Sequence, residues 1–73
     1  METIALEFYE TASIGYARIV SQAACRISQD HFQKVARDIQ ALADLGKVAI
    51  IELRTTPESQ GRLVDLISFT RLE

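Results

Sequence analysis

The sequence is poor in the residues on which disulfides, metal sites and phosphate loops depend. Its 73 residues include one cysteine, one histidine, one proline, three glycines and no tryptophan. Cys25 has no second cysteine to pair with, and one cysteine with one histidine cannot supply the four ligands of a zinc site. The glycines are scattered and do not form a glycine-rich phosphate loop. We therefore expect no metal, no cofactor and no intrachain disulfide.

Long hydrophobic runs are also missing, although 48% of the residues are hydrophobic. No apolar stretch approaches the roughly 18 residues of a membrane-spanning helix. The opening stretch METIALEFYE carries acidic residues where a secretory signal peptide carries basic ones. Together with the lone cysteine, this predicts a cytoplasmic protein with no membrane partner.

The net charge of −2 argues mildly against a general polyanion binder, but the charges are unevenly distributed. The first 17 residues contain acidic residues and no base. Residues 18–37 contain four bases and a single acid. The bases are Arg18, Arg26, Lys34 and Arg37, and the acid is Asp30. This middle segment, with a local balance of +3, is the part of the chain that suits contact with phosphates.

Residues 3–9 fit two secondary structures. Ile4, Leu6 and Phe8 alternate with less apolar residues, as in a half-buried strand. The spacing of four from Ile4 to Phe8 to Ala12 also fits a first helical turn. We prefer the strand and keep the helix as the alternative.

Residues 13–27 predict a helix, because apolar residues from Tyr16 to Ile27 fall on one broad stripe. A clearer helix follows from Ser28 to Leu45. Ser28 is its expected N-cap, Asp30 suits its first turn, and the buried face comprises Phe32, Val35, Ile39, Leu42 and Leu45. Gly46 stands where a left-handed residue commonly ends a helix.

Two β-rich runs, residues 47–55 and 62–72, predict an antiparallel hairpin around a polar tip that contains Pro57 and Gly61. Both runs carry apolar residues on both faces, so part of the sheet needs a further cover. From this excess, and from the small size of the chain, we expect a homodimer. The predicted fold is one α+β domain over residues 1–73, in the order β-α-α-β-β. Two helices pack on a small antiparallel sheet that ends in the hairpin.

The stretch VARDIQALADLGKVAIIELR, residues 35–54, resembles the end of the second helix of a helix-turn-helix and the first wing strand in bacterial winged-helix regulators. SQAACRISQDHF, just before it, suits the first helix of the motif and its turn. The resemblance covers residues 18–72. It implies a winged-helix-like architecture and a dimeric regulator of transcription that binds double-stranded DNA. The helix from Ser28 to Leu45 would then read the DNA, with residues 55–62 as the wing tip.

A recognition helix presents its N-terminal half to the major groove. The resemblance therefore implies DNA contacts by Gln29, Gln33, Lys34 and Arg37. Three further bases of the matched region, Arg18, Arg26 and Arg62, are also candidates. An arginine can hold a guanine or a phosphate with two donors, whereas a lysine acts as a point charge. The alternative without a function in binding is that Lys34 and Arg37 are solvent-facing residues of an amphipathic helix.

Other functional patterns are weak. Cys25 and His31 lack an orienting third group, so we expect Cys25 to be a small core residue and the protein not to be an enzyme. Tyr9, Tyr16 and Phe69 fit core packing better than a stacking platform for single-stranded nucleic acid. The alternative to DNA binding is a protein-interaction or inhibitory module that uses an apolar sheet face.

Overall fold

The structure, a computed structural model, describes residues 3–58 and 61–73. Its helices and strands follow in the order α1 (Thr3–Thr11), β1 (Ala17–Ser21), α2 (Gln22–Cys25), α3 (Gln29–Asp44), β2 (Val48–Glu58) and β3 (Gly61–Arg71). The α+β class predicted from the sequence is confirmed. The predicted order of elements holds from α3 onward and changes before it.

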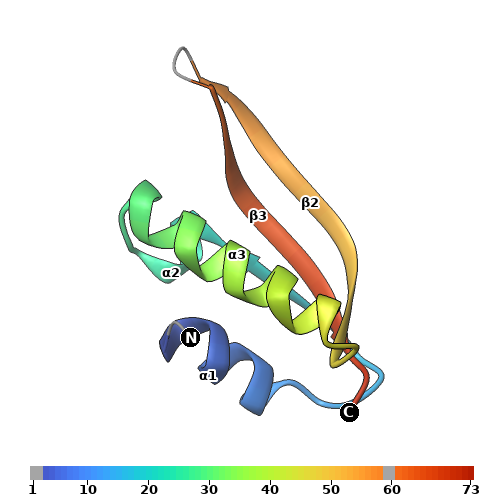
Figure 1. Cartoon of the computed structure of the whole chain (residues 1–73). Helices are drawn as coiled ribbons and strands as arrows, with labels where there is room; N and C mark the ends of the chain where they lie inside the picture. The colour runs from blue at the N-terminus through green and yellow to red at the C-terminus, as the bar shows by residue number, and fades with distance from the viewer. Residues whose placement is uncertain (1–2, 59–60) are drawn as a thin grey trace.

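The three strands form one antiparallel sheet in the order β1-β3-β2, so β3 is the central strand. Helix α3 lies across this sheet, with α1 beside it (Figure 1). The hairpin of β2 and β3 extends well beyond the helical layer, and the molecule is accordingly elongated, 37 × 20 × 19 Å. The helices therefore cover one end of the sheet, and the far end of the hairpin extends beyond them.

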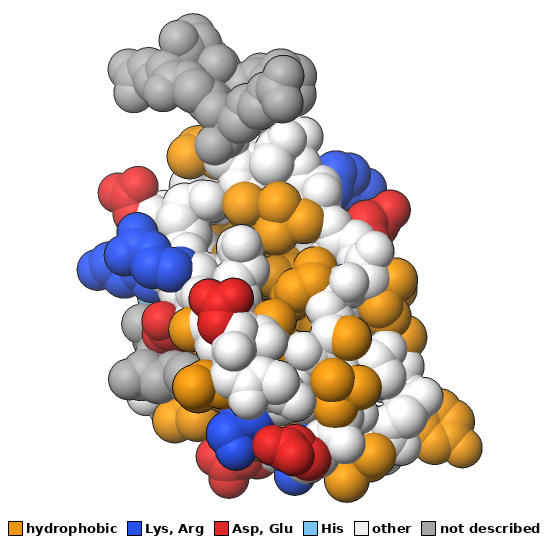
Figure 2. Space-filling view, turned by 45° about the vertical axis from the view of Figure 1, so that its right-hand side comes forward, with side chains coloured by type: hydrophobic (Ala, Val, Ile, Leu, Met, Phe, Trp, Pro, Cys, Tyr) orange, Lys and Arg blue, Asp and Glu red, His pale blue; other side chains and the backbone are white. Residues whose placement is uncertain are grey.

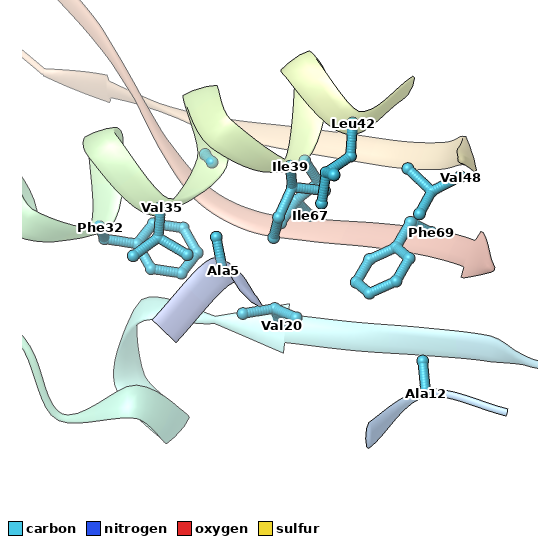
Figure 3. Close-up of a cluster of buried hydrophobic side chains, with 11 residues drawn as sticks. Ala5, Ala12, Val20, Phe32, Val35, Ile39, Leu42, Val48, Ile67 and Phe69 are labelled. Carbon is cyan, nitrogen blue, oxygen red and sulfur yellow. The ribbon is translucent and has the colours of Figure 1, made fainter. Parts of the chain in front are cut away.

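The core lies between α3 and the sheet. In Figure 3, Phe32, Val35, Ile39 and Leu42 point from α3 toward the strand side chains Val20, Ile67 and Phe69. Ala5 of α1 enters the same cluster and is fully buried. Burial of each large side chain of this kind contributes roughly 1.5–3 kcal/mol. The 3–4 spacing of apolar residues in α3 is therefore what fixes the helix on the sheet.

The preferred strand over residues 3–9 is wrong, and the helical alternative is correct. Helix α1 spans Thr3–Thr11. A strand with Ile4, Leu6 and Phe8 on one face would bury all three, but Leu6 is exposed. Ala5 and Ala12 are buried instead, on the side of the chain that faces α3 and the sheet. The packing of Ala5 and Ala12 in the core therefore favours a helix over the strand that the alternating pattern predicted.

The predicted helix over residues 13–27 is also wrong. Gly15 adopts a positive φ of 87°, and the chain then forms β1 before the short helix α2. The β-branched pair Ile19 and Val20 pairs with Ser68 and Ile67 of β3. Val20 is buried, as a half-covered strand requires. β-Branched side chains prefer this environment to a helix when a partner strand is present.

Helix α3 matches its predicted bounds to within one residue at each end, but Leu45, which was predicted on the buried face, is exposed. The Ser28 side chain accepts a hydrogen bond from the His31 N–H at 3.1 Å and so caps the first turn. At the other end Gly46 has a φ of 77°. The N–H of Lys47 donates to the carbonyl of Leu42, and the N–H of Gly46 donates to that of Ala43, both at 3.0 Å. This pair of bonds is a Schellman motif, which confirms the predicted role of Gly46.

The predicted hairpin is confirmed, with strands that run closer to the tip than expected. Its register shifts twice, between Ile50 and Glu52 and between Arg54 and Thr55. Val48 is buried against the core, whereas Ile51 and Leu53 remain exposed. The apolar excess inferred from the sequence of this hairpin therefore stays partly exposed in the single chain.

Arg71 fastens the end of β3 to the end of α1. Its Nη1 donates to the carbonyl oxygens of Tyr9, Glu10 and Ala12 at 3.2–3.3 Å. Its guanidinium also lies 4.5 Å from the centre of the Tyr9 ring. A cation placed on free carbonyls at a helix C-terminus satisfies them and complements the helix dipole. We call this arrangement the Arg71 clasp.

Candidate nucleic-acid interface

Two capped helices and a tight turn precede the hairpin. Ser21 caps α2 by accepting from the Ala24 N–H at 3.2 Å, and Ser28 caps α3 in the same way. Between them Arg26 adopts a left-handed conformation, with a φ of 56°. A glycine would occupy this conformation at lower cost, since it lacks a Cβ. The turn is formed by capping bonds and one strained arginine, which is why no glycine marks it in the sequence.

The outer face of α3 carries the best exposed bases. Lys34 and Arg37 are exposed and lie three residues apart, so they are neighbours on the helix surface. Both lie opposite the buried stripe of α3. The same side of the helix also bears Asp30 near its start and Asp44 near its end. The positive charge is therefore limited to the middle of α3.

Gln33 faces the sheet. Its Nε2 donates to the carbonyl oxygen of Val64 at 2.8 Å, and its Oε1 accepts from the Val64 N–H at 3.0 Å. Nε2 also lies 3.5 Å from Oε1 of Gln29, one turn earlier. Gln33 thus joins α3 to β3, a role that no sequence pattern indicated.

The remaining candidate bases are not all directed toward α3. Arg18 is half-buried and faces α1, because its Nη1 donates to the carbonyl of Thr11 at 3.3 Å and its guanidinium lies 5.0 Å from the centre of the Phe8 ring. Arg26 is exposed in the turn before α3. The side chain of Arg62 lies outside the described residues. Lys34 and Arg37 are therefore the pair that the fold places together on one helix face.

The surface around α3 and the hairpin has mixed charge. Figure 2 shows basic and acidic side chains next to one another, with hydrophobic side chains between them. On the hairpin Nε of Arg54 lies 3.2 Å from Oδ1 of Asp65, in a pair whose arginine is 60% exposed. Such an exposed ion pair contributes little to stability. Any contact with phosphates at this surface rests on a few bases and not on a broad basic field.

A cavity of about 370 Å³ lies between α1 and the start of the sheet. Its lining combines apolar and polar side chains, namely Ile4, Glu7, Phe8, Thr11, Arg18 and Cys25. Burial raises the pKa of the Cys25 thiol above its ordinary value. A nucleophilic cysteine needs a lowered pKa, so this environment suits the small core residue expected from the sequence.

The structure separates the three aromatic residues considered as a stacking platform. Phe69 is fully buried, Tyr9 is half-buried and its hydroxyl donates to the carbonyl of Glu73, and Tyr16 is exposed. Within residues 3–58 and 61–73, no group of three or more His, Cys, Asp or Glu side chains is arranged to hold a metal ion. Over the same ranges, no helix has both the length and the apolar character to cross a bilayer.

Comparison of the chain with protein-family models, with curated protein sequences and with solved structures found no match in any of the three.

Proposed function

We propose that this chain is a small DNA-binding regulator of transcription of the winged helix-turn-helix type, in which α3 reads duplex DNA. The observation that carries the proposal is the position of Lys34 and Arg37 on the outer face of α3. That helix follows a short capped helix and a tight turn, and the hairpin follows it. This order of helix, turn, helix and hairpin supports the proposal.

The dimensions of α3 support the reading role. Its 16 residues form a rod whose buried stripe packs on the sheet, and Asp30, Lys34 and Arg37 of the opposite face are exposed. The major groove of B-DNA admits one such helix. Because the amide of Gln33 is engaged by Val64, we assign the contacts on α3 first to Lys34 and Arg37. Gln29 and Arg26 lie at the entry of the same helix and are secondary candidates.

The mixed charge sets the expected strength of binding. Two bases in the middle of α3 neutralise few phosphates, so a single chain binds non-specific duplex weakly. A dimer would double these contacts and would match a two-fold DNA site, since two-fold operators mirror two-fold proteins. We therefore propose that the DNA-bound form is a homodimer.

The test is a titration of fluorescently labelled duplex DNA with the full chain at low and at moderate salt. The proposal predicts measurable binding at low salt and a fall in affinity as salt rises, because each neutralised phosphate releases counterions. The first titrations use duplexes of mixed sequence as probes, because contacts with phosphates do not depend on the DNA sequence. Absence of binding at low salt to every duplex tested would overturn the proposal.

A second candidate function is a non-enzymatic protein-interaction module. It is favoured by Ile51 and Leu53 on β2, which are 56% and 41% exposed. Exposed apolar groups that cluster on a sheet edge mark interaction surfaces. This candidate predicts no duplex binding at any salt concentration. It also predicts that charged substitutions at Ile51 abolish binding to a protein partner and leave the fold intact.

A further inference from the structure

Four exposed apolar side chains lie in β1, in the segment before it and directly after β3. They are Ile14 at 60%, Tyr16 at 72%, Ile19 at 67% and Leu72 at 51% exposure. The two segments lie side by side, because the N–H of Gly15 donates to the carbonyl of Arg71 at 3.0 Å. The stretch from residue 11 to 17, TASIGYA, contains no charged residue. We call these four residues the apolar corner.

Two of the bases next to this surface are directed toward α1, and a third, Lys47, lies beside Leu72 and pairs with Glu73. Arg18 lies against Phe8 and the end of α1, and Arg71 forms the clasp on the same helix end. A surface with large exposed apolar side chains and few charges is typical of a site that another protein surface covers. The apolar corner therefore has the character of an interface.

The corner adjoins a free sheet edge. In the order β1-β3-β2, β1 pairs with β3 on one side and with no described strand on the other. The opposite edge, β2, carries two register shifts and the exposed charges of Glu52 and Arg54, which discourage pairing with another chain. β1 pairs with β3 without a shift and has neither a proline nor an acidic residue. Its brevity and the charge of Arg18, which is directed toward α1, are the features that limit pairing at this edge.

The sequence of β1 is complementary to itself. An antiparallel pair of β1 strands with a two-fold axis at Ile19 sets Ile19 opposite Ile19 of the second copy. The same register sets Arg18 opposite Val20 and Ala17 opposite Ser21, so no two like charges face each other directly. The register ends at Ser21, and beyond it residues 14–16 of one chain approach the start of α2 of the other, where Ala23 and Ala24 are exposed. Apolar groups then meet apolar groups on both sides of the axis.

From these observations we infer that the chain forms a homodimer in which β1 pairs antiparallel with β1 of a second copy, and the apolar corner is covered at the junction. The contact is isologous, as in most two-chain assemblies, and joins two three-stranded sheets into one of six strands. The inference deepens the proposed function, which calls for two copies on a two-fold DNA site. Its test does not involve DNA.

The experiment is sedimentation velocity of the full chain over a range of protein concentrations. At high concentration the wild type should sediment with twice the 8.2 kDa mass of one chain. Ile19→Lys places a charge at the two-fold axis and should halve that mass. Leu45→Lys is the matched control, because Leu45 is 66% exposed, against 67% for Ile19, and lies at the end of α3. The control should remain dimeric.

A wild type that stays monomeric over the whole range would overturn the inference, and so would equal effects of Ile19→Lys and Leu45→Lys. Circular dichroism reports whether each variant is folded. If Ile19→Lys does not fold, hydrogen exchange of the wild-type β1 amides decides the matter. Exchange that slows as protein concentration rises supports the pairing, and exchange independent of concentration contradicts it. A monomer that binds duplex DNA removes this inference and the proposed dimer but leaves the DNA-binding role of α3, whereas a dimer that binds none removes the DNA-binding role and leaves this inference.

Discussion

The side-chain amide of Gln33 is hydrogen-bonded to both backbone groups of Val64, as donor at 2.8 Å and as acceptor at 3.0 Å. These two bonds join the second turn of α3 to the central strand, 31 residues away along the chain. They hold the N-terminal half of the proposed reading helix against β3, in the half of the hairpin nearer its tip. A glutamine that the sequence offered as a DNA contact is thus a connection between helix and sheet.

Gln33→Ala should lower the free energy of unfolding by roughly 1–3 kcal/mol, because it leaves the half-buried backbone groups of Val64 without their partner. Chemical denaturation measures this loss. Gln40→Ala is the control, since the Gln40 amide donates only to a carbonyl of its own helix and the residue is exposed. The control should change stability by less than about 0.5 kcal/mol. Equal losses in the two variants would contradict the role assigned to Gln33.

The Arg71 clasp makes a second prediction. Arg71→Ala removes three bonds to carbonyls at the end of α1 and the contact with the Tyr9 ring. We expect a loss of roughly 1.5–3 kcal/mol, the range for hydrogen bonds of charged groups. Arg54→Ala is the control, because it removes an arginine that takes part in an exposed ion pair with Asp65. This variant should lower the free energy of unfolding by under about 1 kcal/mol. Thermal melts measure the stability of both variants. A loss of stability in Arg54→Ala as large as that in Arg71→Ala would contradict the role of the Arg71 clasp.

Gly46 tests the end of α3. A Cβ at this position would meet no atom within 4 Å, so the cost of substitution comes from the backbone, whose φ is 77°. Gly46→Ala should destabilise the protein by roughly 1–2 kcal/mol, the cost of the left-handed conformation for an ordinary residue. Gly46→Asn should cost less, because asparagine tolerates this conformation better. Denaturant titration measures the stability of both variants. A Gly46→Ala variant as stable as Gly46→Asn, or more stable, would contradict the left-handed role of Gly46.

Cys25 gives a prediction on pH. Burial raises the pKa of its thiol in the folded state, and the unfolded chain loses that proton at lower pH. The stability that depends on the neutral thiol is present below the unfolded pKa and declines as pH rises through the folded one. Alkylation of Cys25 by iodoacetamide, followed against pH, should therefore give a higher apparent pKa in the native protein than in denaturant. Equal or reversed values would contradict the buried position of the thiol.

The sequence predicted best what local chemistry determines. Helix α3 has a regular apolar spacing, a serine cap and a glycine stop, and all three act within a few residues of one another. The hairpin was likewise predictable from two β-rich runs around Pro57 and Gly61. In contrast, residues 17–21 become a strand because β3 is present to pair with them. That pairing joins residues about 50 positions apart. A local pattern of neighbouring residues therefore cannot indicate it.

The candidate site was predictable only in part. The spacing of Lys34 and Arg37 from the buried stripe was sufficient to place them on the outer face of α3. Arg18 could not be placed in this way, since its position follows from β1 and from the packing of α1, both of which the sequence pattern misassigned. Gln33 and Arg71 act through contacts distant in sequence, so their neighbours along the chain give no indication of their partners.

The most direct measurement of the central claim compares two double variants in duplex binding. Lys34→Ala with Arg37→Ala removes two charges from the outer face of α3, and Lys47→Ala with Arg54→Ala removes two charges elsewhere, so the net charge changes equally. Fluorescence anisotropy over a series of salt concentrations gives the slope of log affinity against log salt. We predict that the α3 variant loses affinity and that its slope is shallower by about 2 per chain, one for each lost phosphate contact, whereas the control keeps the wild-type slope. Identical slopes for the two variants would contradict the assignment of α3 as the DNA-reading element.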